Sequence, residues 1–157
     1  MGGYVGNAVR PGICMYGMVA GDKIKDFARV FEVKTKVLAI NTAECDKRIS
    51  YGRKGLIKKN ETYATLGMGY ADGVKKILSQ NSYAIIRGEK CEIVGEICMD
   101  MCMVRIPEKI KNQILLDDTA IILRDDIIEE STGIYKCACD MLTGIGNRVK
   151  RVYKESK

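Results

Sequence analysis

The chain has 157 residues, of which 46% are hydrophobic and 29% charged, with a formal net charge of +6. This is the length and composition of one soluble globular domain with a proper hydrophobic core. No apolar run approaches the ~20 residues that span a bilayer, and the first residues have neither the basic start nor the apolar middle of a signal peptide. We therefore expect a cytoplasmic protein with no membrane segment in this chain, although a longer parent protein is free to carry one upstream.

Seven cysteines, an odd number, are scattered along the chain. Cys98 with Cys102 and Cys137 with Cys139 have spacings that suit zinc poorly, and the chain has no histidine. Four of the seven lie inside apolar runs, where a free thiol behaves as a small hydrophobic group. We expect reduced thiols in the core and no metal site.

Basic residues are spread along the chain, with short clusters only at residues 58–59 and 148–154. A basic tail near the carboxyl terminus is usually a solvated face. No aromatic interleaving supports nucleic-acid binding, so we expect no nucleic-acid partner.

The first elements expected along the chain are a bend and a long strand. Residues 9–17 run from the bend into a short apolar segment that is closed by a glycine. Residues 29–41 alternate apolar and polar side chains, which predicts a strand with one buried face. That face comprises Phe31, Val33, Thr35, Val37 and Ala39.

The rest of the chain predicts short strands joined by turns. They cover residues 62–68, 82–86, 91–94 and 119–123, with another apolar stretch at 97–105 and a candidate final strand at 145–153. Glycines predict a loop at 69–73, and residues 87–90 give a hairpin signal. Helix is expected in a short turn at 74–79 and over residues 125–142, broken at Gly133. This pattern favours a mainly β domain, a barrel or a sandwich.

Residues 48–53 form a turn that carries Tyr51 between two strand-like runs. Gly52 opens backbone conformations that are closed to other residues. Arg48 and Arg53 flank the tyrosine, and neighbouring cations favour the ionised form of a phenol. The turn is either a surface hairpin that Tyr51 anchors or the site of a tyrosine acting as acid or base; taken alone, these residues favour the anchor.

Five motifs occur in one order, at residues 9–17, 50–53, 69–73, 93–100 and 148–153. Together they resemble the carboxyl-terminal part of the alanine racemase family, the fold-type III pyridoxal-phosphate enzymes. The resemblance implies that residues 1–25 are the last edge of an α/β barrel and residues 26–157 a carboxyl-terminal β domain. In the family the lysine that binds pyridoxal phosphate lies in the barrel, and no lysine here has a matching context.

By this resemblance Tyr51 is the second catalytic base. Racemisation needs proton removal on one face of Cα and return on the other. In the family the cofactor lysine serves one face, and the tyrosine reaches across a homodimer to serve the other.

Arg10 resembles the arginine that donates to the pyridine nitrogen of the cofactor. Because arginine keeps its proton, that nitrogen stays largely unprotonated and the cofactor is a weaker electron sink, which suits racemisation. Gly12 and Ile13 resemble the residues whose amides bind the cofactor phosphate. Taken alone, Arg10 is equally an arginine on a surface turn.

Four more residues receive roles from the resemblance. Met99 matches the residue whose backbone N–H holds the substrate carboxylate, although its side chain is also suited to core filling. Tyr70 and Asp100 match residues at the narrow entrance for substrate, where hydrogen bonds within a hairpin loop are the alternative. Asn147 stands where well-known alanine racemases can carry a tyrosine, and its amide offers a partner to a substrate hydroxyl. Asparagine here resembles the serine-accepting racemases of vancomycin-resistance type.

The main hypothesis is thus the β domain of a racemase that depends on pyridoxal phosphate, acts on alanine or serine, and is inactive without its barrel. The second is a stand-alone β-barrel interaction or regulatory module without catalysis. The third is a small basic barrel that binds nucleic acid. Only the first explains Tyr51, Met99 and Arg10 together.

Overall fold

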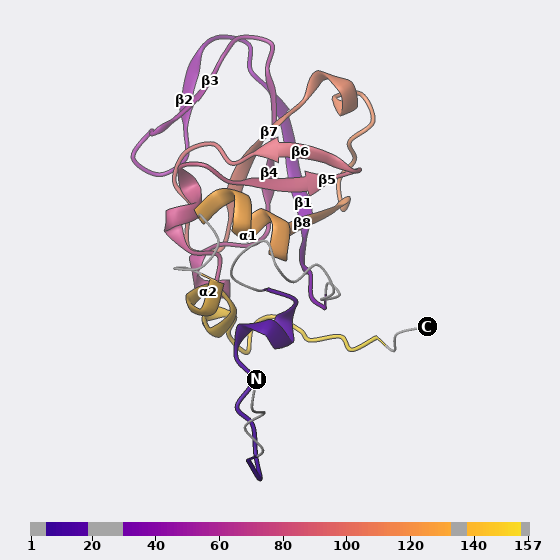
Figure 1. The fold of residues 1–157 in the computed structure, drawn as a ribbon. Helices are drawn as coiled ribbons and strands as arrows, with labels where there is room; N and C mark the ends of the chain where they lie inside the picture. Colours follow the sequence, from indigo (N-terminus) through magenta and orange to yellow (C-terminus); the bar gives the residue numbers. More distant parts are fainter. Residues whose placement is uncertain (1–5, 19–29, 133–137, 155–157) are drawn as a thin grey trace.

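A computed structural model describes residues 6–18, 30–132 and 138–154 of the chain (Figure 1). The strands are β1 (Val33–Thr42), β2 (Lys47–Ile49), β3 (Gly55–Ile57), β4 (Thr62–Leu66), β5 (Tyr83–Ile86), β6 (Glu89–Glu92), β7 (Cys102–Ile106) and β8 (Thr119–Leu123). The α-helices are α1 (Asp125–Thr132) and α2 (Ala138–Gly144), and short 3₁₀ turns are η1 (Ile13–Tyr16), η2 (Tyr70–Asp72), η3 (Lys76–Ser79) and η4 (Glu108–Ile110).

Six of the strands form one antiparallel sheet in the order β6-β5-β8-β1-β4-β7. Its two edges meet just beyond β6, where the Val94 amide donates to the Met103 carbonyl at 2.8 Å and Ile93 pairs with Val104. The sheet is therefore nearly closed into a barrel. The predicted mainly β fold is confirmed.

Strand β1 serves both halves of the barrel. Residues 33–36 pair with β8 and residues 37–42 with β4, and the pairing with β4 contains a register shift between Val37 and Ala39. Such a bulge bends a strand and increases its twist. Val33 and Val37 are buried, as the alternating pattern predicts.

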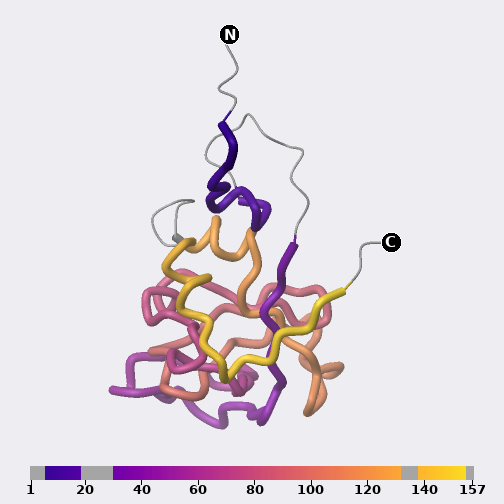
Figure 2. Tube along the Cα trace, turned by 90° about the horizontal axis from the view of Figure 1, so that it is seen from below, coloured from indigo at the N-terminus to yellow at the C-terminus, as the bar shows by residue number. Residues whose placement is uncertain are grey.

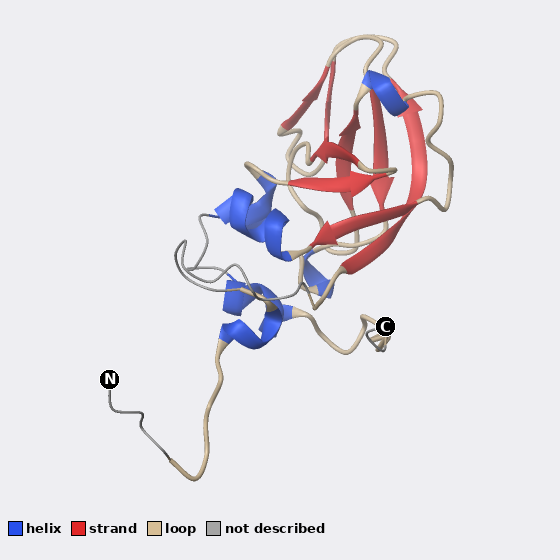
Figure 3. Cartoon of the chain, turned by 45° about the vertical axis from the view of Figure 1, so that its right-hand side comes forward, coloured by secondary structure: helices blue, strands red, loops and turns tan. Residues whose placement is uncertain are grey.

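Two hydrophobic clusters hold the fold. The larger is filled from the strands, and α1 closes one side of it over β5 and β8 (Figure 3). Ile127 and Ile128 of α1 are fully buried, and each such burial contributes about 1.5–3 kcal/mol. The smaller cluster packs Ile49 and Ile57 against Ala43, Tyr63 and Val94. It fastens the two-stranded β2–β3 hairpin to the barrel.

Several expected boundaries differ from the structure. The β5–β6 connection is a two-residue turn, Arg87 at φ 50° and Gly88 at φ 83°, which are the positive values that a type I′ turn requires. Strand β7 begins only at Cys102, because the Cys98 amide donates to the Met101 carbonyl and closes a turn. Helix is described at 125–132 and at 138–144, and Gly133, where a break was expected, lies outside the described residues.

The expected final strand at residues 145–153 is wrong. Ile145 and Val149 pack on the core, but the segment pairs with no sheet edge within the described part of the chain. Arg151 instead donates to the carbonyls of Ile145 and Gly146, at 2.8 and 3.4 Å. These bonds fold the tail onto itself rather than onto the sheet.

The expectation of core thiols is correct for two of the six described cysteines, all of which are free. Burial raises the pKa of Cys91 and Cys102 to about 12. Cys45 and Cys139 are exposed. Within the described residues no three potential metal ligands gather, and no helix is long and apolar enough to cross a membrane.

Candidate active site

Tyr51 lies in an unusual backbone turn at the end of the β2–β3 hairpin. Ser50, Gly52 and Arg53 all have left-handed conformations, with φ of 69°, 65° and 54°, and such values are uncommon for residues other than glycine. The Tyr51 side chain is 78% exposed. It therefore does not anchor the hairpin, which the smaller cluster fastens.

Cations surround this turn. Arg48 donates from Nη1 to the Arg53 carbonyl at 3.4 Å, a bond that spans the turn. Lys54 forms an ion pair of 2.8 Å with Glu96, and this pair lowers the pKa of the Glu96 carboxyl. The turn thus presents an exposed phenol on a segment rich in basic residues.

The Tyr70 loop and the Met99 loop are joined through their backbones. The amides of Tyr70 and Ala71 donate to the carbonyls of Cys98 and Met99, both at 3.0 Å. A Cβ at Gly69 would overlap these two carbonyl oxygens, so the close approach requires glycine. Because Tyr51 pairs with Glu96, three residues before Met99, all three segments form one surface.

Met99 and Tyr70 are both accessible on this surface. The Met99 side chain is 54% exposed, so it does not fill the core, and its amide donates to no described residue. Tyr70 is 38% exposed, and the Lys76 ammonium lies 4.8 Å from the centre of its ring, within cation–π range.

Arg148 attaches the carboxyl-terminal tail to the same surface. Its Nη2 lies 2.6 Å from Asp100 Oδ1, and its Nε lies 3.4 Å from Asp72 Oδ1. The hydrogen bond to Asp100 and the charges of both carboxylates raise the pKa of the guanidinium. Asn147, the preceding residue, is exposed.

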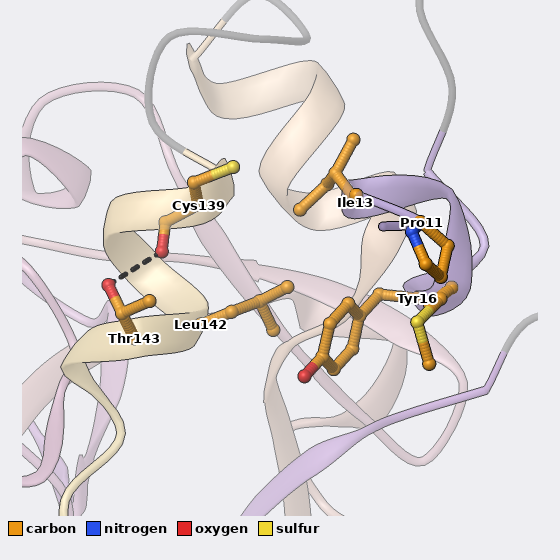
Figure 4. Close-up of a pocket in the computed structure, with 8 residues that line it drawn as sticks. Pro11, Ile13, Tyr16, Cys139, Leu142 and Thr143 are labelled. Atoms are coloured by element: carbon orange, nitrogen blue, oxygen red, sulfur yellow. Dashed lines mark hydrogen bonds between the residues drawn. The ribbon is translucent and has the colours of Figure 1, made fainter. Parts of the chain in front are cut away.

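A second candidate surface lies at η1. An open groove of about 410 Å³ separates this turn from α2 (Figure 4). It is lined by Pro11, Gly12, Ile13, Met15 and Tyr16 on one side and by Cys139, Leu142 and Thr143 on the other. The amides of Gly12 and Ile13 donate to no described residue, and Arg10 is exposed with no ion pair in the described chain. These groups fit an anionic ligand such as a phosphate.

Comparison with known proteins identifies the family. The family described as alanine racemase, C-terminal domain, matches residues 30–153. The chain belongs to this family. It is 41% identical to an alanine racemase of Fusobacterium nucleatum over 94% of the chain, and 38% identical to one of Clostridium novyi over 92%. The solved alanine racemase of Clostridium difficile 630 is 33% identical over 91% of the chain, with a TM-score of 0.77.

This racemase-family domain spans about two fifths of those proteins: 42% of the Fusobacterium protein, 40% of the Clostridium novyi protein and 39% of the solved chain. The first surface reaches α2, because Gly73, at the end of the Tyr70 loop, packs against Gly144 at the end of that helix. The β2–β3 hairpin, by contrast, lies at the opposite end of the molecule from η1 in both views (Figures 1 and 2).

The structure thus brings Tyr51, Tyr70, Met99 and Asp100 onto one face, with Asn147 attached through Arg148, and leaves Arg10, Gly12 and Ile13 on the other. Sequence reasoning missed Glu96, Lys76 and Arg148 in this racemase-family domain. Glu96 and Arg148 contact residues 51 and 100 across distant parts of the sequence, and Lys76 contacts Tyr70 from six residues further along the chain. For Arg148 the sequence did hold a signal, because this arginine lies in one of the five motifs and its partners Asp72 and Asp100 lie in two others.

Proposed function

We propose that the chain is the carboxyl-terminal β domain of an amino-acid racemase that depends on pyridoxal phosphate. In this proposal Tyr51 serves a site that a second subunit completes. The observation that supports it is the separation of the β2–β3 hairpin, whose turn carries the exposed Tyr51, from η1, which directly follows Gly12 (Figure 1). A homodimer allows each subunit to bring its Tyr51 face to the η1 face of its partner.

Tyr51 is the proton carrier of this chain. Racemisation requires one group to take the Cα proton and another to return a proton to the opposite face. The Tyr51 oxygen takes or gives the proton on one face, and a lysine of the barrel domain acts on the other.

Met99 and Arg148 orient the substrate. The Met99 amide, which has no partner among the described residues, donates to the substrate carboxylate. Arg148 holds Asp100 and Asp72 at the rim of this face, beside the entrance that Tyr70 and Asp100 border. Asn147 lies next to Arg148 and accepts or donates a hydrogen bond to the hydroxyl of a serine substrate.

Pyridoxal phosphate, when bound, withdraws electrons from Cα and so makes its proton acidic. The groove at η1 fits its phosphate, because the amides of Gly12 and Ile13 are available there. Arg10 donates to the pyridine nitrogen. In this proposal the covalent anchor is the lysine of the barrel domain, and the isolated chain is inactive.

Subunit complementation tests this proposal. The chain is joined to the remaining part of the Fusobacterium nucleatum protein, and two variants are made: Tyr51→Phe and one that lacks the barrel lysine. Each variant is inactive alone. After subunit exchange, half of the dimers are hybrids with one intact site each, so about one quarter of the activity should return.

If Tyr51 acted within its own subunit, no mixture would recover activity, because every subunit would carry a defect. Tyr153→Phe is the matched control, since Tyr153 is also exposed, at 90%. It should be fully active without any partner.

A further inference from the structure

Three contacts from the Tyr51 turn converge on one residue, Glu96. The Ser50 hydroxyl donates to the Glu96 carbonyl at 2.6 Å, Tyr51 pairs with Glu96 through the backbone, and Lys54 Nζ lies 2.8 Å from Glu96 Oε1. The contacts come from residues before, at and after the tyrosine. They fix the turn on both of its sides.

The packing beneath the turn leaves little freedom. Gly95 has φ 77°, and a Cβ there would lie 2.5 Å from the Cβ of Ser50. Ser50 and Arg53 adopt left-handed conformations without being glycine. Such conformations persist only where the surroundings hold them, and they cluster at functional sites.

The Tyr51 phenol itself makes no hydrogen bond to a described residue, and its side chain is 78% exposed. Its position is therefore set by the backbone of the turn and not by contacts of the ring. Glu96 lies three residues before Met99 in the same loop. The contacts that hold the turn against Glu96 therefore also fix the position of Tyr51 relative to the Met99 amide.

We propose that Ser50, Lys54 and Glu96 are positioning residues for Tyr51, and we name these three residues the Glu96 latch. The latch rests on the proposed function, because it holds the proton-transfer group at a set position relative to the amide that binds the substrate carboxylate. Misplacement of a reacting group by about 1 Å can lower a rate about 100-fold. The latch thus acts on turnover more than on substrate binding.

The ion pair between Lys54 and Glu96 is expected to contribute little to the stability of the fold. The Lys54 side chain is 65% exposed and that of Glu96 26%, and ion pairs at such positions contribute little to stability. The β2–β3 hairpin is attached to the barrel mainly by the hydrophobic cluster around Ile49 and Ile57, which does not involve Tyr51. Loss of the pair should therefore leave the fold intact and alter the placement of the turn.

A charge-reversal cycle in the two-domain enzyme tests the latch. Lys54→Glu and Glu96→Lys should each lower kcat about tenfold with KM changed less than about twofold, and the double variant should recover to within about threefold of the parent. Thermal unfolding temperatures of all three should stay within about 3 °C of the parent. The control is Lys34→Glu, which reverses a comparable exposed pair, Lys34 with Glu32 at 2.6 Å, and should leave kcat unchanged.

Ser50→Ala provides an independent test of the same latch. It removes the hydroxyl while leaving the side chain small enough for Gly95, and should lower kcat about tenfold. Asn60→Ala is its matched control, since Asn60 is also left-handed, with φ 70°, at the other end of β3. It should affect stability without affecting kcat.

The outcomes separate the latch from the proposed function. Parent-like kcat in Lys54→Glu, Glu96→Lys and Ser50→Ala, or a double variant no better than the singles, would overturn the latch. If Tyr51→Phe measured alongside loses activity, the proposed function stands in either case. A fully active Tyr51→Phe would overturn the proposed function itself.

Discussion

Arg148 Nη2 lies 2.6 Å from Asp100 Oδ1, across 48 residues of sequence. This contact attaches the carboxyl-terminal tail to the loop that carries Met99. It places Asn147, which lies outside any helix or strand, beside the proposed substrate face. The identity of residue 147 is therefore expected to influence which substrate is preferred.

Asn147→Tyr should shift the preference from serine towards alanine in the two-domain enzyme. The substitution shrinks the space and removes a partner for the serine hydroxyl, and an unpaired buried polar group costs about 1–3 kcal/mol. The ratio of kcat/KM for serine to that for alanine should fall about tenfold. Asn112→Tyr, at an exposed asparagine elsewhere, should leave the ratio unchanged; equal losses on both substrates would limit Asn147 to supporting the cofactor or the fold.

Gly69→Ala should disturb substrate binding. The added methyl group overlaps the carbonyl oxygens of Cys98 and Met99, so the Met99 amide must move and KM should rise at least about tenfold. Gly67→Ala is the control, because the three atoms nearest to its Cβ all belong to the side chain of Leu38, which is 54% exposed and can rotate away. Steady-state kinetics with an unchanged KM in Gly69→Ala would contradict the carboxylate role of the Met99 loop.

Asp118 should make stability depend on pH. It accepts two hydrogen bonds from Arg87, at 2.6 and 3.0 Å, and one from the Leu115 amide, and these contacts hold its pKa below the ordinary value. Because the folded pKa is lowered, the stabilisation is complete above about pH 4, the usual range of a free aspartate, and disappears as the pH falls through the lowered value. Asp118→Asn should melt about 2–4 °C lower at pH 7.

The difference between Asp118→Asn and the parent should shrink as the pH is lowered from 5 to 3, as followed by urea unfolding at each pH. A difference that stays constant over this range would show that the charge of Asp118 is not what stabilises the turn.

The isolated chain should not attach pyridoxal phosphate covalently at one site. No lysine lines the groove at η1 among the described residues. After incubation with the cofactor, borohydride reduction and digestion, mass spectrometry should show only slow labelling scattered over several lysines. One lysine labelled in stoichiometric yield would contradict the assignment of the anchor to the barrel domain.

The strands of the barrel were predictable because their signals are local. The turn residues before Thr119 place β8 to the residue, and the alternation that buries Val33 and Val37 locates β1, although its start was expected four residues too early. The conformation of the carboxyl-terminal tail was not predictable in this way. Its apolar residues do pack on the core, but Arg151 donates hydrogen bonds to nearby carbonyls, and the tail does not pair as a strand. Apolar spacing alone does not distinguish these two outcomes.

The candidate site divides in a similar way. The turn around Tyr51 could be located from Gly52 and the flanking arginines, but its role came from the resemblance to a family. The pairing of Tyr51 with Glu96 joins segments 45 residues apart, and a glutamate before an apolar run gives no local sign of it. The separation of Arg10 from Tyr51 is likewise visible only in three dimensions.

The central claim is that Tyr51 transfers the proton on one face of Cα. The most direct measurement is exchange of the Cα hydrogen with deuterium oxide in the Tyr51→Phe variant of the two-domain enzyme, followed separately from L- and D-alanine. Racemisation should fall at least about 100-fold, and exchange should survive much better from one enantiomer than from the other, since the lysine face is intact. Equal exchange from both enantiomers with undiminished racemisation would contradict the claim and return Tyr51 to a surface turn.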